Sequence, residues 1–342
     1  FTLAQMGYWE ARGSEEFKLE RQVAKYPEAL QRLKAYVSNF AKTGSDNIPA
    51  ALESIGRLHA DLGELDKAEE AYAQLKDKDG PRASRLATEI FSQYQEQVKA
   101  LTAELDAAIA KDATPGQVSA AKAAADAVRS KLVALGMDYI DNSPKPQLAV
   151  LVNTLLGYEE LGEWKKVDDV AQKTLTLYGS DTTDSVKRVV DLVVRPMVGE
   201  ALLQQKRFQE AYDMLLAAEK ANPTQWELKR QIARCLGGWF EVQNGSGVAV
   251  PGLDRPDEAY KKYYGEYRQW ALRPDVKPFS LDWYRFHWEC FWFAKQASAK
   301  DSQFKDIAAK FYRIAKATDN FATLKSYGLE GSRLHNFFLL NR

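Results

Sequence analysis

The chain has 342 residues, of which 45% are hydrophobic and 27% charged, as is usual for a globular protein. Lysine plus arginine and aspartate plus glutamate each number 47, so the formal net charge is zero. This balance removes the whole-chain electrostatic argument for nucleic acid or an anionic membrane as a partner. No stretch approaches the ~20 apolar residues that a membrane-spanning helix needs.

The chain begins at Phe1 rather than at a methionine, and a helical pattern is already present there. We therefore expect a processed or truncated chain, for which cytoplasmic and exported locations both stay open. The two cysteines, Cys235 and Cys290, each lie among large apolar residues. We expect buried free thiols, whereas a bond between them would indicate an oxidising compartment.

Residues 1–80 are predicted to form helix pairs at the N-terminus. From Pro27 to Phe40 the apolar residues recur at helical spacing, as in the second helix of a pair. A clearer pair follows, marked by Ile55, Gly56, His59, Gly63, Ala68, Tyr72 and Leu75. The small side chains of Gly56 and Ala68 let two antiparallel helices approach closely, and Gly63 falls in the turn between them.

Residues 81–143 have a different pattern, because apolar residues alternate three and four apart as in a heptad seam. Two such stretches flank Thr114-Pro115-Gly116-Gln117, where threonine and glutamine can form a capping box and proline suits the first helical position. This pattern predicts a long antiparallel helical hairpin inserted between repeats. Two long helices packed against their neighbours are the alternative.

The spacing of the first clear pair returns twice in residues 144–223. The second copy consists of Leu155, Tyr158, Gly162, Val167, Ala171 and Thr174. The third consists of Gly199, Leu202, Ala211, Leu215 and Ala218, closed by Pro223. Both are weaker than the first, because Val167 replaces a small residue and Lys206 replaces the turn glycine. Three copies in register nevertheless indicate a helical repeat.

These motifs resemble the tetratricopeptide repeat, although Leu52 stands where the family usually has a tryptophan. The resemblance implies an all-α fold, a right-handed superhelix of antiparallel helix pairs. In that family the first helices of the pairs line a concave groove, which takes extended peptides or partner helices.

The resemblance also places candidate groove residues on this sequence: Glu53, Arg57 and Asp61 from the first clear repeat, and Asn153, Leu156 and Glu160 from the second. Asn153 matches an asparagine that some members use to hold a peptide carboxylate. The basic partners of that clamp are missing here, so we do not transfer it.

Residues 224–342 are predicted to form degenerate, aromatic-rich helical repeats and a C-terminal helix. Five of the eight tryptophans lie between Trp239 and Trp292. Trp283, Trp288 and Trp292 cannot all point one way on a helix of 3.6 residues per turn. Two roles stay open for these tryptophans, because such aromatics suit both a helical core and a partner surface.

The sequence contains no motif that carries catalysis. The three histidines are scattered, and neither zinc spacing, nor a nucleophile elbow, nor a phosphate- or dinucleotide-binding loop is present. We therefore predict no catalytic, cofactor or metal-binding residues and no nucleic-acid partner. The sequence favours a non-enzymatic scaffold or adaptor that binds a protein or peptide. A self-assembling structural protein is the alternative, and a helical glycan-acting enzyme, suggested by the aromatics and carboxylates, has the least support.

Overall fold

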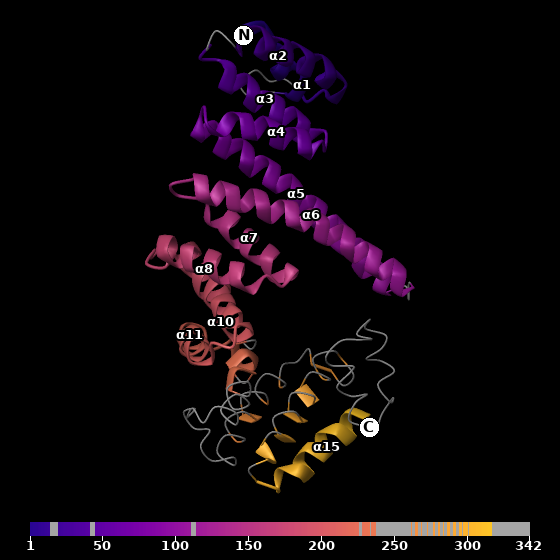
Figure 1. Ribbon diagram of the computed structural model, residues 1–342, viewed down its shortest axis with the longest axis vertical. Coiled ribbons are helices and arrows are strands. Elements are labelled where there is room, and N and C mark those ends of the chain that lie inside the picture. The colour runs from indigo at the N-terminus through magenta and orange to yellow at the C-terminus, as the bar shows by residue number, and fades with distance from the viewer. Residues whose placement is uncertain are drawn as a thin grey trace. The chain divides into compact units, whose positions relative to one another are not determined.

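The computed structural model describes residues 1–13, 20–41, 45–110, 114–225 and 228–236 except 233, single positions and short pieces between 261 and 299, and residues 301–316. Every regular element in these ranges is a helix, and they contain no strand, so the all-α prediction is confirmed (Figure 1). Among the same residues, no helix combines the length and the apolar character that crossing a membrane requires.

The chain divides into two compact units, which we describe separately. The first contains residues 1–106 and 119–157. Its helices are α1 (Thr2–Arg12), η1 (Val23–Lys25), α2 (Tyr26–Phe40), α3 (Ile48–Asp61), α4 (Leu65–Lys76), most of α5 (Gly80–Ala110), most of α6 (Pro115–Asn142) and the start of α7 (Leu148–Leu161). Adjacent helices pack on one another, α1 on α2, α2 on α3 and α3 on α4. The division of the chain into the four regions 1–80, 81–143, 144–223 and 224–342, which was made from the sequence, stays a prediction.

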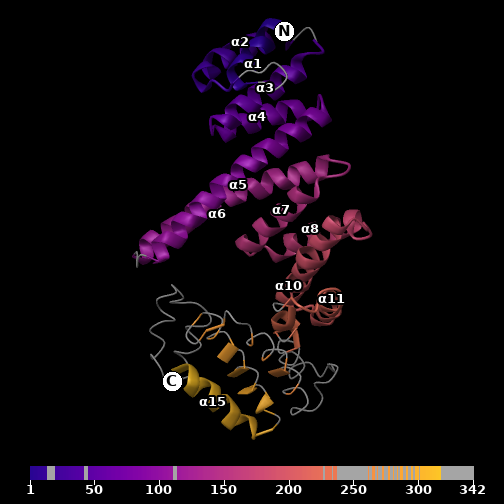
Figure 2. The same ribbon diagram turned by 180° about the vertical axis from the view of Figure 1, so that it is seen from behind.

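Two helices of the first unit are much longer than the rest, α5 with 31 residues and α6 with 28. They lie side by side in both views (Figure 2). Before α6, the N–H of Gln117 donates to Thr114 Oγ1, and the N–H of Thr114 donates to Gln117 Oε1 at 2.9 Å. These are the two reciprocal bonds of the predicted capping box.

The second unit contains residues 107–118 and 158–342. Its helices after α7 are α8 (Trp164–Tyr178), α9 (Asp184–Val189), the π-helix η3 (Val190–Val194), α10 (Arg195–Gln204), α11 (Phe208–Ala221) and α15 (Phe304–Lys316). Helix α10 packs on α11 and on α8. Cys235 and Cys290 are buried free thiols, as predicted, and burial raises the pKa of Cys235 to about 12.

A proline that the sequence analysis did not single out lies two residues after the π-helix. Pro196 has no N–H, so it cannot donate to the carbonyl of Leu192 four residues earlier. The side-chain amide of Gln225 donates to that carbonyl instead, at 3.1 Å. A neighbouring segment thus donates to a carbonyl to which the proline cannot donate.

One turn recurs at the end of α3, α7 and α10. Gly63 and Gly162 have φ angles of 73° and 72°, and Lys206 has 61° at the corresponding place. In each turn the next residue donates its N–H to a carbonyl five residues back at 2.9 Å, in the pairs Glu64–His59, Glu163–Tyr158 and Arg207–Leu202. This is a left-handed helix C-cap, which glycine adopts without steric cost and lysine does not. The third copy therefore keeps the turn without its glycine.

Close helix contacts lie at the small residues that the repeat pattern singled out. A Cβ atom on Gly56 would lie 2.5 Å from Leu86 Cδ2, and one on Gly199 would lie 2.4 Å from Leu215 Cδ2. Ala68 and Ala211 are fully buried. These positions set how near the neighbouring helices come.

The close approach at Gly56 predicts an effect on stability. Gly56→Ala should cost about 1–3 kcal/mol of unfolding free energy, because Leu86 is fully buried and cannot move aside freely. Gly116→Ala is the matched control, since nothing lies within 4 Å of its Cβ position, and it should leave stability unchanged or raise it. Urea unfolding of both variants tests this. Equal midpoints would show that α3 and α5 do not make the close contact.

Candidate functional site

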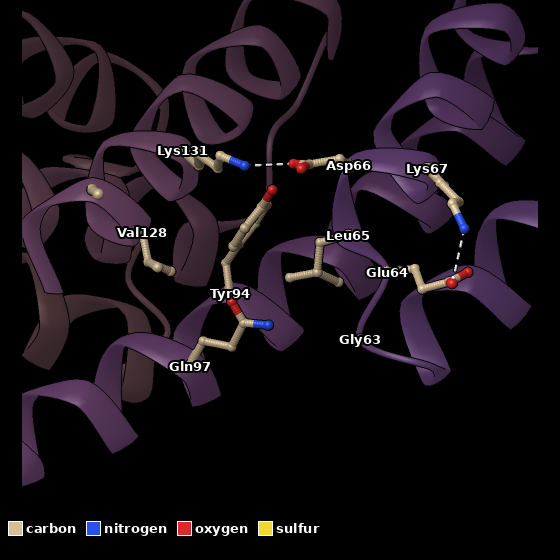
Figure 3. Close-up of a pocket in the computed structure, with 10 residues that line it drawn as sticks. Gly63, Glu64, Leu65, Asp66, Lys67, Tyr94, Gln97, Val128 and Lys131 are labelled. Atoms are coloured by element: carbon tan, nitrogen blue, oxygen red, sulfur yellow. Dashed lines mark hydrogen bonds and ion pairs between the residues drawn. The ribbon is translucent and has the colours of Figure 1, made fainter. Parts of the chain in front are cut away.

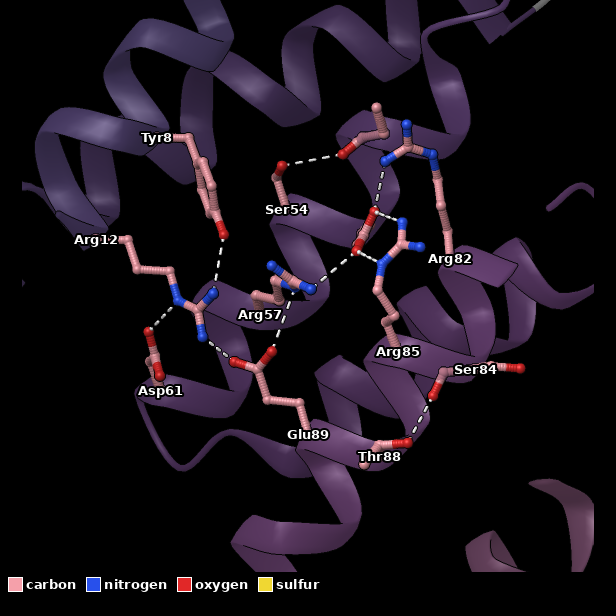
Figure 4. Close-up of polar contacts among 12 residues, drawn as sticks. Tyr8, Arg12, Ser54, Arg57, Asp61, Arg82, Ser84, Arg85, Thr88 and Glu89 are labelled. Atoms are coloured by element: carbon pink, nitrogen blue, oxygen red, sulfur yellow. Dashed lines mark hydrogen bonds and ion pairs between the residues drawn. The ribbon is translucent and has the colours of Figure 1, made fainter. Parts of the chain in front are cut away.

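Charged side chains from three helices of the first unit converge on one face, which we call the α1/α3/α5 face (Figure 4). Helix α3 contributes Glu53, Arg57 and Asp61, whose spacing of four residues places them on one side of the helix. The other members are Arg12 from α1, Arg21 from the segment before η1, and Arg82, Arg85 and Glu89 from α5. The three helices are thereby joined by ion pairs as well as by apolar packing.

Glu53 holds one end of this face. Its side chain is only 7% exposed, and it accepts from Arg82 at 2.6 Å and Arg85 at 3.1 Å, with Arg57 at 3.0 Å. Burial acts to raise the pKa of Glu53, but the hydrogen bonds from Arg85 and Arg82 and the charge of Arg57 outweigh it. The pKa therefore lies below its ordinary value, and Glu53 is a carboxylate at neutral pH.

Asp61 holds the other end. Its side chain, 8% exposed, accepts from Arg12 Nε at 2.9 Å and from the Tyr26 hydroxyl at 3.0 Å, and Arg21 lies 3.6 Å away. Burial and the neighbouring Asp61 charge raise the pKa of Tyr26 to about 12. The phenol therefore stays protonated and acts as a donor to the carboxylate.

Glu89 joins the two ends, because it pairs with both Arg12 and Arg57. Arg57 Nε lies 3.2 Å from Glu89 Oε2, an ion-pair distance without the angle of a hydrogen bond. Burial raises the pKa of Glu89 more than the two arginines lower it. Through the pairs of Glu89 with Arg12 and Arg57, the ion-pair network is continuous from Asp61 to Glu53.

A pocket of about 400 Å³ opens on this face at the Asp61 end. It is lined by Tyr8, Trp9, Arg12, Gly13, Arg21, Arg57 and Asp61. Three guanidinium groups and two aromatic rings thus surround one carboxylate that is already paired. This arrangement suits binding of an anionic group next to an apolar one.

A second pocket of the first unit, of about 520 Å³, lies between the α3–α4 turn, α5 and α6 (Figure 3). Buried Leu65 and Tyr94 contribute to its wall. Its four charged residues pair with one another, Glu64 with Lys67 and Asp66 with Lys131. Opposite charges balance there, so this pocket offers no net charge to a ligand.

In the second unit, Asp168 pairs with Arg207 at 2.9 Å and Glu200 with Arg234 at 2.9 Å. Burial, together with the charges of Glu160 and Glu200, raises the pKa of Glu159. Among the described residues no group of His, Cys, Asp and Glu side chains could hold a metal ion.

The structure brings together three of the six predicted groove residues, Glu53, Arg57 and Asp61. Asn153 donates its amide to the carbonyl of Ala149 in its own helix, at 2.8 Å, and Leu156 is 37% exposed. Glu160 is exposed and belongs to the other unit.

Of the three predicted interface tryptophans, only Trp283 lies in the described part of the chain. It is half-buried, with its ring centroid 4.1 Å from that of His287. Trp288 and Trp292 fall outside the described residues. The role of these aromatics, in the core or at an interface, stays a prediction.

The sequence analysis missed the partners of the groove residues, namely Arg12, Arg82, Arg85 and Glu89. On α5 the spacing of three and four residues from Arg82 to Arg85 and Glu89 is a visible signal, because it puts three charges on one side. That spacing alone is equally typical of a solvated helix face. Only the packing of α5 beside α3 distinguishes the two.

No family model matches the sequence, and a search of curated proteins found no similar one.

The pKa of Glu53 predicts a pH-dependent contribution to stability. Glu53→Gln should cost about 2–4 kcal/mol at pH 7, because three arginines lose their buried carboxylate. Because the pKa of Glu53 is lower in the folded state, its carboxylate stabilises the fold at pH values above the ordinary pKa of 4.5. This stabilisation is lost as the pH falls through the folded-state pKa. The difference from the parent protein should therefore shrink in acid, as measured by urea unfolding at pH values from neutral down to well below the ordinary pKa of glutamate.

Glu28→Gln is the control for this measurement. Glu28 pairs with Arg32 on α2 but is 62% exposed, so its replacement should change stability by less than about 1 kcal/mol. A cost for Glu53→Gln that stays constant with pH would contradict the charged state assigned to Glu53.

Proposed function

We propose that this protein is a non-enzymatic scaffold of the tetratricopeptide kind, which binds a segment of another protein on the α1/α3/α5 face. The observation that carries the proposal is the pocket at the Asp61 end, where Trp9 and Tyr8 stand beside three arginines. Aromatic and arginine side chains are the residues that contribute most to binding energy at protein interfaces.

The assignment to this kind of repeat is supported by the recurrent turn at Gly63, Gly162 and Lys206. It is supported further by the close approaches at Gly56 and Gly199, where small residues let helices pack. In the repeat family that these motifs resemble, the groove is lined by the first helices of successive pairs. Here α3 takes that place in the first clear repeat. The long helices α5 and α6 would then be a hairpin inserted into the array.

The state of the charged groups favours binding over chemistry. Glu53, Asp61 and Glu89 are each held by arginine, so none is a free base beside a nucleophile. The arginines are in turn fixed by these carboxylates. Side chains ordered before a partner arrives lose little conformational entropy on binding, which raises affinity without new contacts.

Selection from a random peptide library tests the proposal without presuming the partner's charge. Phage displaying random peptides should yield binders of the intact chain. Trp9→Ala should weaken the selected peptides about 10-fold or more, because loss of an interface tryptophan often costs 2 kcal/mol or above. Binding is measured by fluorescence anisotropy, and light scattering reports the oligomeric state in the same samples.

Trp164→Ala is the matched control, since Trp164 is also half-buried but begins α8 in the other unit. It should change affinity by less than about twofold. Failure to select any peptide would contradict the proposal. Peptides whose affinity is unchanged by Trp9→Ala would place the site elsewhere. Self-association through this face would favour the alternative of a self-assembling structural protein.

A further inference from the structure

We infer that the bound segment is acidic and carries two carboxylates three or four residues apart. This inference rests on the proposed function and names the chemistry of the partner. It is carried by how the charges of the α1/α3/α5 face are distributed between its interior and its surface.

The most buried charged side chains of this face are carboxylates and the most exposed are arginines, with Arg12 and Arg57 in between at 24% and 25% exposed. The carboxylate side chains of Glu53, Asp61 and Glu89 are 7%, 8% and 21% exposed. In contrast, the side chains of three arginines are 36–52% exposed, namely Arg82, Arg21 and Arg85. A partner therefore meets guanidinium groups first, although the chain as a whole has no net charge.

The count of charges points the same way. The face contains five arginines but only four carboxylates, even when Asp79, which pairs with Arg82, is included. Each guanidinium has five N–H donors, and Arg85, for example, donates to Glu53 through Nε and Nη2. The remaining donors can bind a second carboxylate in the planar, charge-assisted geometry that arginine favours.

The spacing of the two exposed arginine groups sets the spacing in the ligand. Arg21 lies at Asp61, whereas Arg82 and Arg85 lie at Glu53, eight residues earlier on α3. At 1.5 Å per residue this separation is about 12 Å along the helix. An extended peptide covers about 3.3–3.6 Å per residue, so carboxylates three or four residues apart reach both ends. An apolar residue at the Asp61 end would enter the pocket beside Trp9.

A polypeptide fits this face better than a nucleic acid. Affinity for nucleic acid grows with the number of phosphates that free lysines and arginines neutralise. Here the arginines are already partly neutralised by buried carboxylates, and the net excess is a single charge. A short acidic segment needs only two such contacts together with an apolar anchor.

The test uses a synthetic ten-residue peptide with two glutamates four residues apart and one leucine, acetylated and amidated so that no terminal charge contributes. Its affinity for the intact chain is compared, at low salt, with that of the same peptide carrying glutamine in place of both glutamates. The glutamate peptide should bind about 10-fold more tightly. A single-stranded oligonucleotide is measured alongside.

The double variant Arg21→Gln/Arg85→Gln should lower the affinity for the glutamate peptide about 3- to 10-fold and so remove most of its advantage over the glutamine peptide. The reason is that the variant deletes one exposed arginine at each end of the face. Both side chains are about half exposed, so the fold should persist, as thermal unfolding will show. Arg32→Gln is the matched control, since Arg32 on α2 is equally exposed at 51% but pairs with Glu28 outside the face. It should alter affinity less than about twofold.

Equal binding of the glutamate and glutamine peptides would overturn the inference, and so would tighter binding of the oligonucleotide. If neither peptide binds but the random library yields binders sensitive to Trp9→Ala, the acidic preference is wrong and the proposed function stands. Absence of binders from that library would instead count against the proposed function itself.

Discussion

Burial of carboxylates between helices is the constraint on which the first unit depends. Taking an isolated charge out of water costs several kcal/mol, so Glu53, Asp61 and Glu89 can lie at the α1, α3 and α5 contacts only with cationic partners. Arginine meets this need better than lysine, because its planar group can bind two carboxylates at once, as Arg12 does with Asp61 and Glu89. The ion pairs therefore join α1, α3 and α5 to one another in addition to their apolar contacts. The same side chains that meet this structural need supply the surface proposed to bind a partner.

Much of the fold could be predicted from the sequence because its repeat is marked at positions where backbone geometry is demanding. Gly63 and Gly162 lie in turns that require a positive φ, and Gly56 and Gly199 lie where a Cβ would meet a leucine of the neighbouring helix. Such requirements restrict the residue type strongly and so leave a visible pattern. The capping box at Thr114 and Gln117 was predictable for the same reason, since both of its bonds are local. Where the requirement is met in another way, as by Lys206, the pattern weakens although the turn is kept.

The candidate site was predictable only in part. Glu53, Arg57 and Asp61 could be placed on one side of α3 from their spacing, because a single helix determines it. Their partners Arg12 and Glu89 are 49 and 28 residues from Asp61, so no local rule relates them. Charged residues at helical spacing also look alike whether they face water or another helix. That the most buried charges of the face are carboxylates and the most exposed are guanidinium groups results from packing, and it has no counterpart in the composition, which is balanced.

The proline in α10 has a consequence for how the second unit folds. If the proposed helical repeat extends through this unit, most contacts join neighbouring repeats, so stability is nearly a sum of local terms and segments can fray one at a time. The carbonyl of Leu192 accepts a hydrogen bond from the side chain of Gln225, which is 33 residues further along the chain, beyond the whole of α11. This hydrogen bond can form only when the segment after α11 lies beside η3. It joins η3 to a part of the chain on the far side of α11 in the sequence, a contact more distant than those between adjacent helices.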